Sequence, residues 1–236
     1  MSMSKLNNGK KLTPTILFED THLIVLSKPA GLLSQGGPDK PNLPNLVDWL
    51  RSYLGRHYVG LIHRLDRNTS GIMLVAKRTK SAARLSQALQ RGEISRTYLG
   101  WVEGRITKPP QWQHYLVKDE QKNLVSITSE SSPNAKLASL KADPIAYGTW
   151  QGIDLTLLEF NLDTGRSHQI RVQCAHEGLP LLGDTKYGSG KTTDFGRPAL
   201  HSYRLSFRHP VLKNIMAFCA EPPADMKTPS LKISRP

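Results

Sequence analysis

One aspartate, Asp66, stands alone among basic residues, and its neighbours suggest what its carboxylate could do. It lies between Arg64 and Arg67 in the segment LIHRLDRNTSGIMLVAK (61–77). Guanidinium groups close to a carboxylate favour its ionised form even when it is partly buried. A positioned, ionised carboxylate can act as a nucleophile or as a general base. The structural alternative is an ordinary turn, because Asp-Arg-Asn-Thr-Ser-Gly is also common loop chemistry.

Other catalytic and metal-binding patterns find little support in the chain. YGSGKTT (187–193) lacks the first glycine of a phosphate-binding loop, since position 185 is threonine, and we expect a surface turn there. There is no HExxH and no GxSxG motif, and His168 and His176 have no carboxylate in ligand register. Cys174 and Cys219 show no CxxC spacing. We therefore expect no metal site, which leaves carboxylate chemistry.

The charge of the chain points to a polyanionic partner. Its 236 residues contain 32 Lys and Arg against 19 Asp and Glu, a net charge of +13. Ten of these basic residues fall between positions 51 and 98, where the acidic residues are Asp66 and Glu93. Such clustering suits a phosphate-binding face, although any single basic residue could simply be solvated.

The pattern around these residues indicates an α+β fold. Short alternating segments predict strands near 16–26, 70–77, 96–104, 112–160 and 200–221, joined by polar turns. Helical spacing appears in LVDWLRSYL (46–54), in TKSAARLSQALQRG (79–92) and in TGRSHQIRVQCAHEG (164–178), with Thr79 and Ser167 as expected caps. Strands that outnumber helices without regular alternation favour a mostly antiparallel central sheet flanked by helices and loops.

Length and composition suggest one catalytic domain. We expect it to span residues 15–226, between a short leader (1–14) and a tail (227–236). Two unpaired cysteines indicate a reducing compartment, and no window is apolar enough for a membrane helix or a signal peptide. We therefore expect a cytoplasmic protein with no membrane partner, and a monomer as the simplest state.

Several separated motifs give the chain a more specific resemblance. They are SKPAG (27–31), HRLDRNTSGIMLVAK (63–77), RTY (96–98) and LDTGRSHQIRVQCAHEGLPLLGDTKYG (162–188), followed by LHS (200–202) and AEPPADM (220–226). In this order they resemble the RluA family of RNA pseudouridine synthases. The resemblance implies the pseudouridine synthase fold with a mixed sheet, and isomerisation of uridine to pseudouridine in ribosomal RNA, transfer RNA or both. It also implies that neither a cofactor nor a metal is used.

The resemblance implies roles for particular residues. Asp66 matches the family's essential aspartate, Tyr98 its base-stacking tyrosine, and Arg171 the arginine that would form an ion pair with Asp66. Arg64 is similar to the residue that fills the gap left by a flipped uridine. The remaining matched positions would contact RNA or support the site: Lys28, Arg67, Thr164, Gly165, Arg166 and His168.

Two further interpretations remain open. Larger family members carry an N-terminal S4-type RNA-binding domain, and the roughly fifteen residues before the first expected strand are too few for one. RNA affinity is then expected to come from the catalytic domain's own basic face. The rival functions are a catalytically silent RNA-binding module with the same fold, and a nucleotide-dependent phosphotransferase built on GSGKTT.

Overall fold

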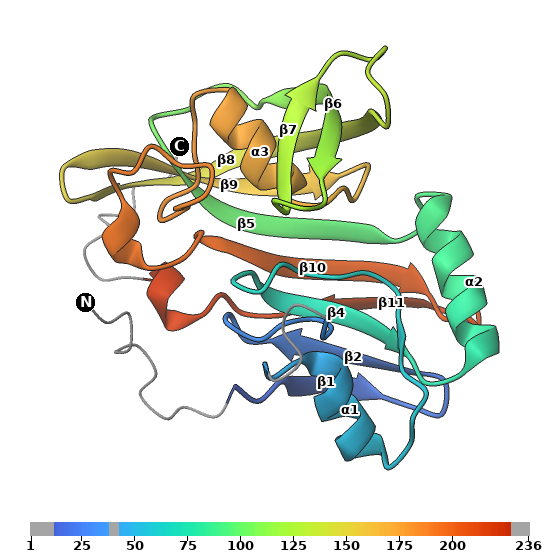
Figure 1. Cartoon of the computed structure of the whole chain (residues 1–236). Helices are drawn as coiled ribbons and strands as arrows, with labels where there is room; N and C mark the ends of the chain where they lie inside the picture. The colour runs from blue at the N-terminus through green and yellow to red at the C-terminus, as the bar shows by residue number, and fades with distance from the viewer. Residues whose placement is uncertain (1–11, 38–42, 228–236) are drawn as a thin grey trace.

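The computed structural model describes residues 12–37 and 43–227 (Figure 1). Its strands are β1 (Thr15–Glu19), β2 (Leu23–Lys28), β3 (Gly60–Leu61), β4 (Ser70–Ala76), β5 (Ser95–Glu103), β6 (Gln111–Asp119), β7 (Leu124–Thr128), β8 (Lys136–Trp150), β9 (Ile153–Leu162), β10 (Leu200–Arg208) and β11 (Ile215–Cys219). Its helices are α1 (Leu46–Leu54), α2 (Thr79–Gln90) and α3 (Gln169–His176), with short 3-10 turns η1 (Thr193–Phe195) and η2 (Ala224–Lys227). The expected leader and tail lie mostly outside the described residues.

The described strands form one mixed sheet. Its order is β1-β2-β4-β10-β5-β9-β8-β6-β7, with β11 paired to β10 and β3 paired to β4. The β10–β4 pair is parallel, and the other pairs are antiparallel. This arrangement confirms the predicted α+β class and the mostly antiparallel mixed sheet.

Strand β4 has its two faces in two different cores, because side chains of a strand alternate between faces. Met73 and Val75 pack in the core cluster that also contains residues of α1, α3 and β5. Ile72 and Leu74 pack in the cluster that contains Leu85 of α2. Since all seven residues of β4 are buried, the loop that precedes the strand begins from a fixed base.

A close backbone approach joins β4 to β10. Gly71 has a φ of +113°, and a Cβ placed there would lie 2.1 Å from the carbonyl oxygen of Ser202. Only glycine permits both the backbone conformation and this distance. The glycine of the TSG triplet, five residues after Asp66, therefore lets the parallel pair of β4 and β10 form.

Two predicted helix caps are wrong by one residue each. Helix α2 begins at Thr79, and its cap residue is Arg78, which makes no side-chain capping bond. Helix α3 is capped by His168, in the left-handed conformation with a φ of +53°, and not by Ser167. The side chain of Gln169 caps the turn instead, because its Oε1 accepts hydrogen bonds from the Arg166 amide at 3.0 Å and from Thr164 Oγ1 at 2.7 Å.

The YGSGKTT segment is a turn that is tied to the sheet. The hydroxyls of Ser189 and Thr192 both donate to the buried carboxylate of Glu103 on β5, each with a contact of 2.8 Å. A carboxylate at this position would repel a bound phosphate. The segment is therefore not arranged as a phosphate-binding loop, which argues against the phosphotransferase alternative.

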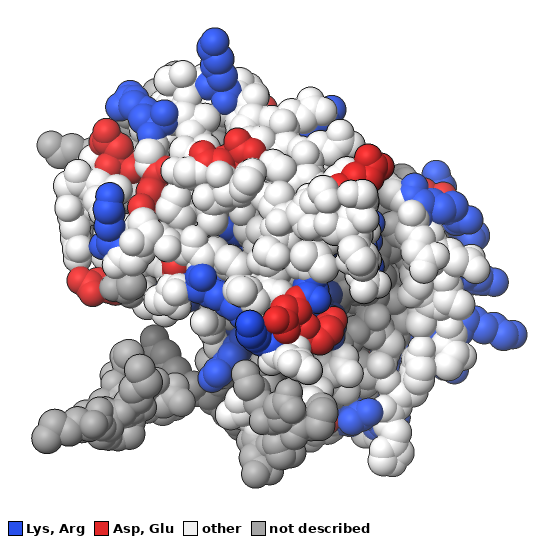
Figure 2. Space-filling view, turned by 45° about the horizontal axis from the view of Figure 1, so that its top comes forward, with Lys and Arg blue, Asp and Glu red and all other residues white. Residues whose placement is uncertain are grey.

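Basic side chains mark one edge of the molecule. In Figure 2 they gather along the right-hand edge, where α2 lies in Figure 1. Lys80, Arg84 and Arg91 are exposed on or just after this helix, as the sequence predicted. Among the helices formed by the described residues, none has the length and apolar composition needed to span a lipid bilayer.

Candidate active site

The loop that carries Asp66 is fixed on both sides of the aspartate. Before it, the Ser34 hydroxyl donates to the Leu65 carbonyl at 2.6 Å and accepts from the Leu65 amide at 3.1 Å. After it, the Thr69 amide donates to the Asp66 carbonyl at 3.1 Å and closes the turn. The hydroxyl and the turn together limit how far the Asp66 side chain can be displaced.

Two buried cations hold the backbone immediately after Asp66. Lys28 is completely buried, and its Nζ donates to the carbonyls of Pro29, Leu32 and Arg67 at 3.0, 2.8 and 3.1 Å. Burial lowers the pKa of Lys28 to about 7, while the charge of Asp66 acts in the opposite direction. Arg197 Nη1 donates to the Asn68 carbonyl at 3.2 Å. Lys28 thus supports the loop, and its burial leaves no surface for a phosphate.

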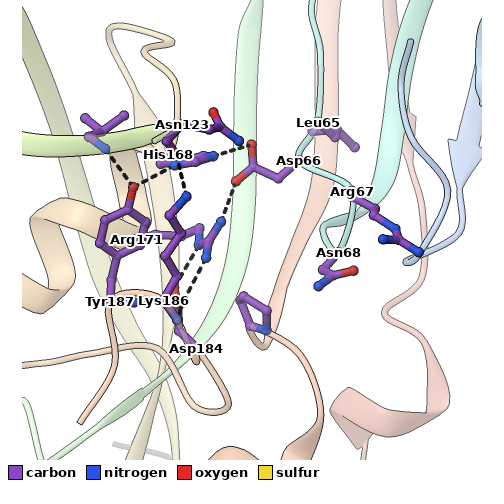
Figure 3. Close-up of polar contacts among 12 residues, drawn as sticks. Leu65, Asp66, Arg67, Asn68, Asn123, His168, Arg171, Asp184, Lys186 and Tyr187 are labelled. Atoms are coloured by element: carbon purple, nitrogen blue, oxygen red, sulfur yellow. Dashed lines mark hydrogen bonds and ion pairs between the residues drawn. The ribbon is translucent and has the colours of Figure 1, made fainter. Parts of the chain in front are cut away.

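The Asp66 carboxylate is paired with Arg171, from the first turns of α3 (Figure 3). Arg171 Nη1 lies 3.1 Å from Asp66 Oδ2, while its Nε and Nη2 bind the buried Asp184 carboxylate at 2.7 and 2.8 Å. Burial alone would lower the pKa of Arg171, but the two carboxylates raise it above its ordinary value. Burial likewise opposes ionisation of Asp184, and Arg171 outweighs it, so the pKa of Asp184 lies below its ordinary value.

His168 and Tyr187 complete the surroundings of the carboxylate (Figure 3). The Tyr187 hydroxyl accepts from the Val125 amide at 2.9 Å and lies 2.7 Å from His168 Nδ1. When that hydroxyl donates to Nδ1, the hydrogen of the neutral imidazole sits on Nε2, which faces Asp66 Oδ1 at 3.8 Å. Burial lowers the pKa of His168, although the charge of Asp66 opposes this. A neutral His168 therefore orients a weak donor toward the aspartate.

The other predicted residues lie around this pair with different exposures. Tyr98 is buried on β5, and burial raises the pKa of its phenol; the charge of Asp66 is close enough to act in the same direction. Arg64 is exposed. Arg67 directs its Nε to the Gly31 carbonyl at 3.0 Å, and the exposed Arg166 directs its Nε to the Leu137 carbonyl at 2.8 Å. Within the described chain, the arginines adjacent to Asp66 in sequence form no ion pair with it.

Comparison with known proteins shows the family to which this chain belongs. Residues 22–176 match the family model described as RNA pseudouridylate synthase. The uncharacterized RNA pseudouridine synthase YjbO of Bacillus subtilis is 36% identical over 89% of this chain and 73% of its own length. The ribosomal large subunit pseudouridine synthase D of Vibrio cholerae is 32% identical over 92% of this chain and 70% of its own length. The chain belongs to the RNA pseudouridylate synthase family.

The solved structures agree at the level of the fold. Human RNA pseudouridylate synthase domain containing 1 superimposes with a TM-score of 0.79, at 21% sequence identity, over 98% of this chain and 92% of its own. The RluA-type resemblance seen in the motifs is thereby confirmed, and the pseudouridine synthase is an isomerase that acts on RNA. The ion pair between Asp66 and Arg171, which the resemblance implied, is present in the structure.

The sequence did not single out two residues that support the Asp66–Arg171 pair. Asp184 fixes two of the three nitrogens of Arg171, and Tyr187 lies under the same guanidinium, with its ring centroid 5.0 Å from Cζ. Both lie in the GDTKYG segment. An aspartate three residues before a tyrosine gives no local sign that either contacts a distant arginine. Their contacts make α3 and the 184–187 segment one unit.

One group of side chains in the described residues could offer ligands to a metal. The ligand atoms of His114, His176 and Glu177 lie within 4.8 Å of one another, at the end of α3 away from Asp66. The Gln173 amide nitrogen lies 3.0 Å from His114 Nδ1, so His114 carries its hydrogen on Nε2 and directs it to Glu177 Oε1 at 3.0 Å. That hydrogen occupies the position a metal would need. The absence of a metal requirement stays a prediction.

Proposed function

We propose that this pseudouridine synthase isomerises uridines in ribosomal RNA or transfer RNA with Asp66 as its catalytic carboxylate. The observation that carries the proposal is the position of Asp66 on a fixed loop, with one oxygen paired to Arg171 and the side chain 28% exposed. A half-exposed, oriented carboxylate can reach the sugar of a bound nucleotide, by attack at C1′ or by removal of a proton. Ribosomal RNA is favoured because the Vibrio cholerae relative is a ribosomal large subunit pseudouridine synthase.

The roles of the other residues follow from their positions. Arg171 would position Asp66, since Asp184 fixes its guanidinium, and Tyr98 would stack on the target base. Arg64 is exposed beside Asp66 and could occupy the gap in the RNA stack after the uridine flips out. Arg67, Arg166 and His168 would line the path of the RNA backbone. The cytoplasmic location and the monomeric state stay predictions.

The test is release of tritium from RNA labelled at uracil C5. Wild type, Asp66→Ala and Asp66→Asn would be compared on separated ribosomal and transfer RNA fractions that lack the modification. We expect release by wild type from at least one fraction and none by either variant. Circular dichroism and RNA binding by the variants would show that the loss is not caused by misfolding.

The opposite result would favour the alternative of a catalytically silent RNA-binding module. RNA binding by wild type without release from either fraction would contradict the catalytic proposal. Release by Asp66→Asn at the wild-type rate would remove Asp66 from the mechanism. Activity should also survive EDTA, and a loss that added zinc or magnesium reverses would contradict the metal-free expectation.

A further inference from the structure

A buried arginine beside the site has no partner within the described residues. Arg96, on β5, is only 8% exposed. Its Nε is enclosed without a hydrogen-bond partner, and its guanidinium forms none of the hydrogen bonds or ion pairs found in the described part of the chain. Buried cations are normally paired, because removing a charge from water without compensation is unfavourable. The position of Arg96 therefore requires an explanation outside the folding of the chain itself.

The two groups whose pKa the charge of Arg96 affects, His63 and Tyr98, are neutral near pH 7. Its charge acts on His63 and on Tyr98, and it helps to lower the pKa of His63, which is fully buried. An imidazole and a phenol cannot neutralise a guanidinium. By contrast, Arg171 pairs with two carboxylates. Within the described residues, Arg171 therefore has anionic partners and Arg96 has none.

The loop before α3 is shaped to lie against this guanidinium. A Cβ at Gly165 would be 2.4 Å from Arg96 Nη1 and 3.2 Å from its Cζ. Glycine at this position lets the backbone of the TGRSH segment approach the arginine closely, and the exposed Arg166 and Ser167 follow it. The guanidinium consequently lies between this loop and β5.

The register of β5 relates Arg96 to the target base. Residues two apart on a strand share a face and lie about 7 Å from each other. Arg96 and Tyr98 therefore point to the same side of the sheet. A base stacked on Tyr98 brings its sugar–phosphate backbone toward the guanidinium, whose planar donors match the oxygens of a phosphodiester.

We propose that Arg96 is a binding site for the RNA backbone, and that its missing partner is a phosphodiester group next to the flipped uridine. This inference rests on the proposed function, because the anion comes from the bound RNA. The free protein keeps an unpaired buried charge, and substrate binding neutralises it. Gly165 belongs to the same site, since it permits the loop to close over the guanidinium.

The first test measures the thermal stability of the RNA-free protein. Arg96→Met replaces the unpaired charge with an apolar side chain of similar length, and we expect its Tm to equal or exceed that of wild type. An arginine that only supports the fold would give the opposite result. A lower Tm for Arg96→Met would therefore overturn the proposal.

The second test measures how binding depends on salt. The probe is a labelled five-nucleotide oligouridylate, bound by an Asp66→Asn protein in which turnover is blocked. Each phosphate contact contributes about 0.7 to the slope of log affinity against log salt for single strands. We expect Arg96→Gln to reduce the slope by about this amount and to weaken binding at low salt.

Arg204→Gln is the matched control for this measurement. Arg204 is exposed on β10 opposite Thr97, on the other face of the sheet from Arg96, and is paired with Glu159. The Arg204→Gln substitution should leave the slope of log affinity against log salt unchanged. An equal slope for Arg96→Gln, or no binding of the probe by the parent protein, would contradict the phosphate site. Tritium release by wild type in either case would leave the proposed isomerase standing.

Discussion

Two largely enclosed arginines near the loop that carries Asp66 are surrounded in opposite ways. Arg171 binds Asp184 with two nitrogens and Asp66 with a third, and its side chain is 11% exposed. Arg96 is buried as well, but it forms no ion pair with the described residues. The first arginine is complete without RNA and can hold a carboxylate in place before substrate arrives. The second gains an anionic partner only when RNA binds.

The difference suggests that one arginine positions a side chain and the other binds the ligand. Positioning a catalytic group requires contacts that exist in the free protein, because catalysis depends on geometry set in advance. Binding requires contacts that form with the ligand, and a charge left unpaired in the free protein favours that step. The variants below test whether the two arginines differ in this manner.

The largest effect is expected from Arg171→Met. Without the guanidinium, Asp66 loses its ion pair and Asp184 is left as an unpaired buried carboxylate. A small misplacement of a catalytic group can cost about 100-fold in rate, and we expect at least this loss in single-turnover tritium release. Arg204→Met, on an exposed residue, is the control. A rate within threefold of wild type would show that Arg171 does not position Asp66.

The next effect concerns stability. Asp184→Asn leaves Arg171 without its bidentate partner, and breaking a buried ion pair costs about 3–5 kcal/mol. The control is Asp225→Asn. Asp225 is the bidentate partner of Arg197, but its side chain is 44% exposed. Solvent screening should limit that cost to about 1 kcal/mol. Urea unfolding compares the two, and similar losses would mean that burial of the Asp184 pair adds nothing.

The elements of the fold were largely predictable from local pattern. The leucine spacing in 46–54 predicted α1 with the bounds that the structure has, and the alternating pattern within 112–160 predicted strands there, of which β7 is one. Such signals are contained in a few consecutive residues. The cap of α3 was missed because it depends on the left-handed backbone of His168 and on the side chain of Gln169, which ordinary capping preferences do not include.

The contacts within the site were less predictable. The ion pair between Asp66 and Arg171 followed from family resemblance, since 105 residues separate the two and no spacing rule connects them. The role of Asp184 depends on the placement of α3 against the 184–187 segment. The missing partner of Arg96 could not be read from RTY at all, because the absence of a contact has no sequence pattern.

A smaller effect concerns pH and the neighbour of Arg96. His63 accepts a hydrogen bond from the Leu74 amide at Nε2, 3.1 Å away, and burial together with the charge of Arg96 lowers its pKa to about 3. The unfolded chain binds a proton at His63 below about pH 6.5, whereas the folded chain does not. Because of His63, the free energy of unfolding is highest above pH 6.5. It declines by about 1.4 kcal/mol per pH unit as the pH falls toward 3.

Urea unfolding between pH 6 and pH 4.5 would measure this slope. His63→Gln keeps an acceptor for the Leu74 amide and should flatten the slope in this window. His57→Gln, on an exposed imidazole, should leave it as in wild type. Arg96→Met should leave the slope between pH 6 and pH 4.5 nearly unchanged but raise the pH at which the decline levels off, because the charge of Arg96 is the second cause of the lowered pKa of His63. With unfolding followed down to pH 3, a decline that levels off at the same pH in Arg96→Met as in wild type would show that the charge of Arg96 is already neutralised in the free protein.

The smallest effect is expected from Tyr187→Phe, which separates the two kinds of support around Arg171. The phenylalanine ring still lies beneath the guanidinium, but the acceptor for the buried Val125 amide and the donor to His168 are lost. An unsatisfied buried amide costs about 1–3 kcal/mol, so urea unfolding should show a loss near the lower end of this range. The turnover rate should stay within about threefold of wild type, because Asp184 alone fixes Arg171. A loss of rate comparable to that of Arg171→Met would instead place the orientation of His168, and not the ion pair, in control of Asp66.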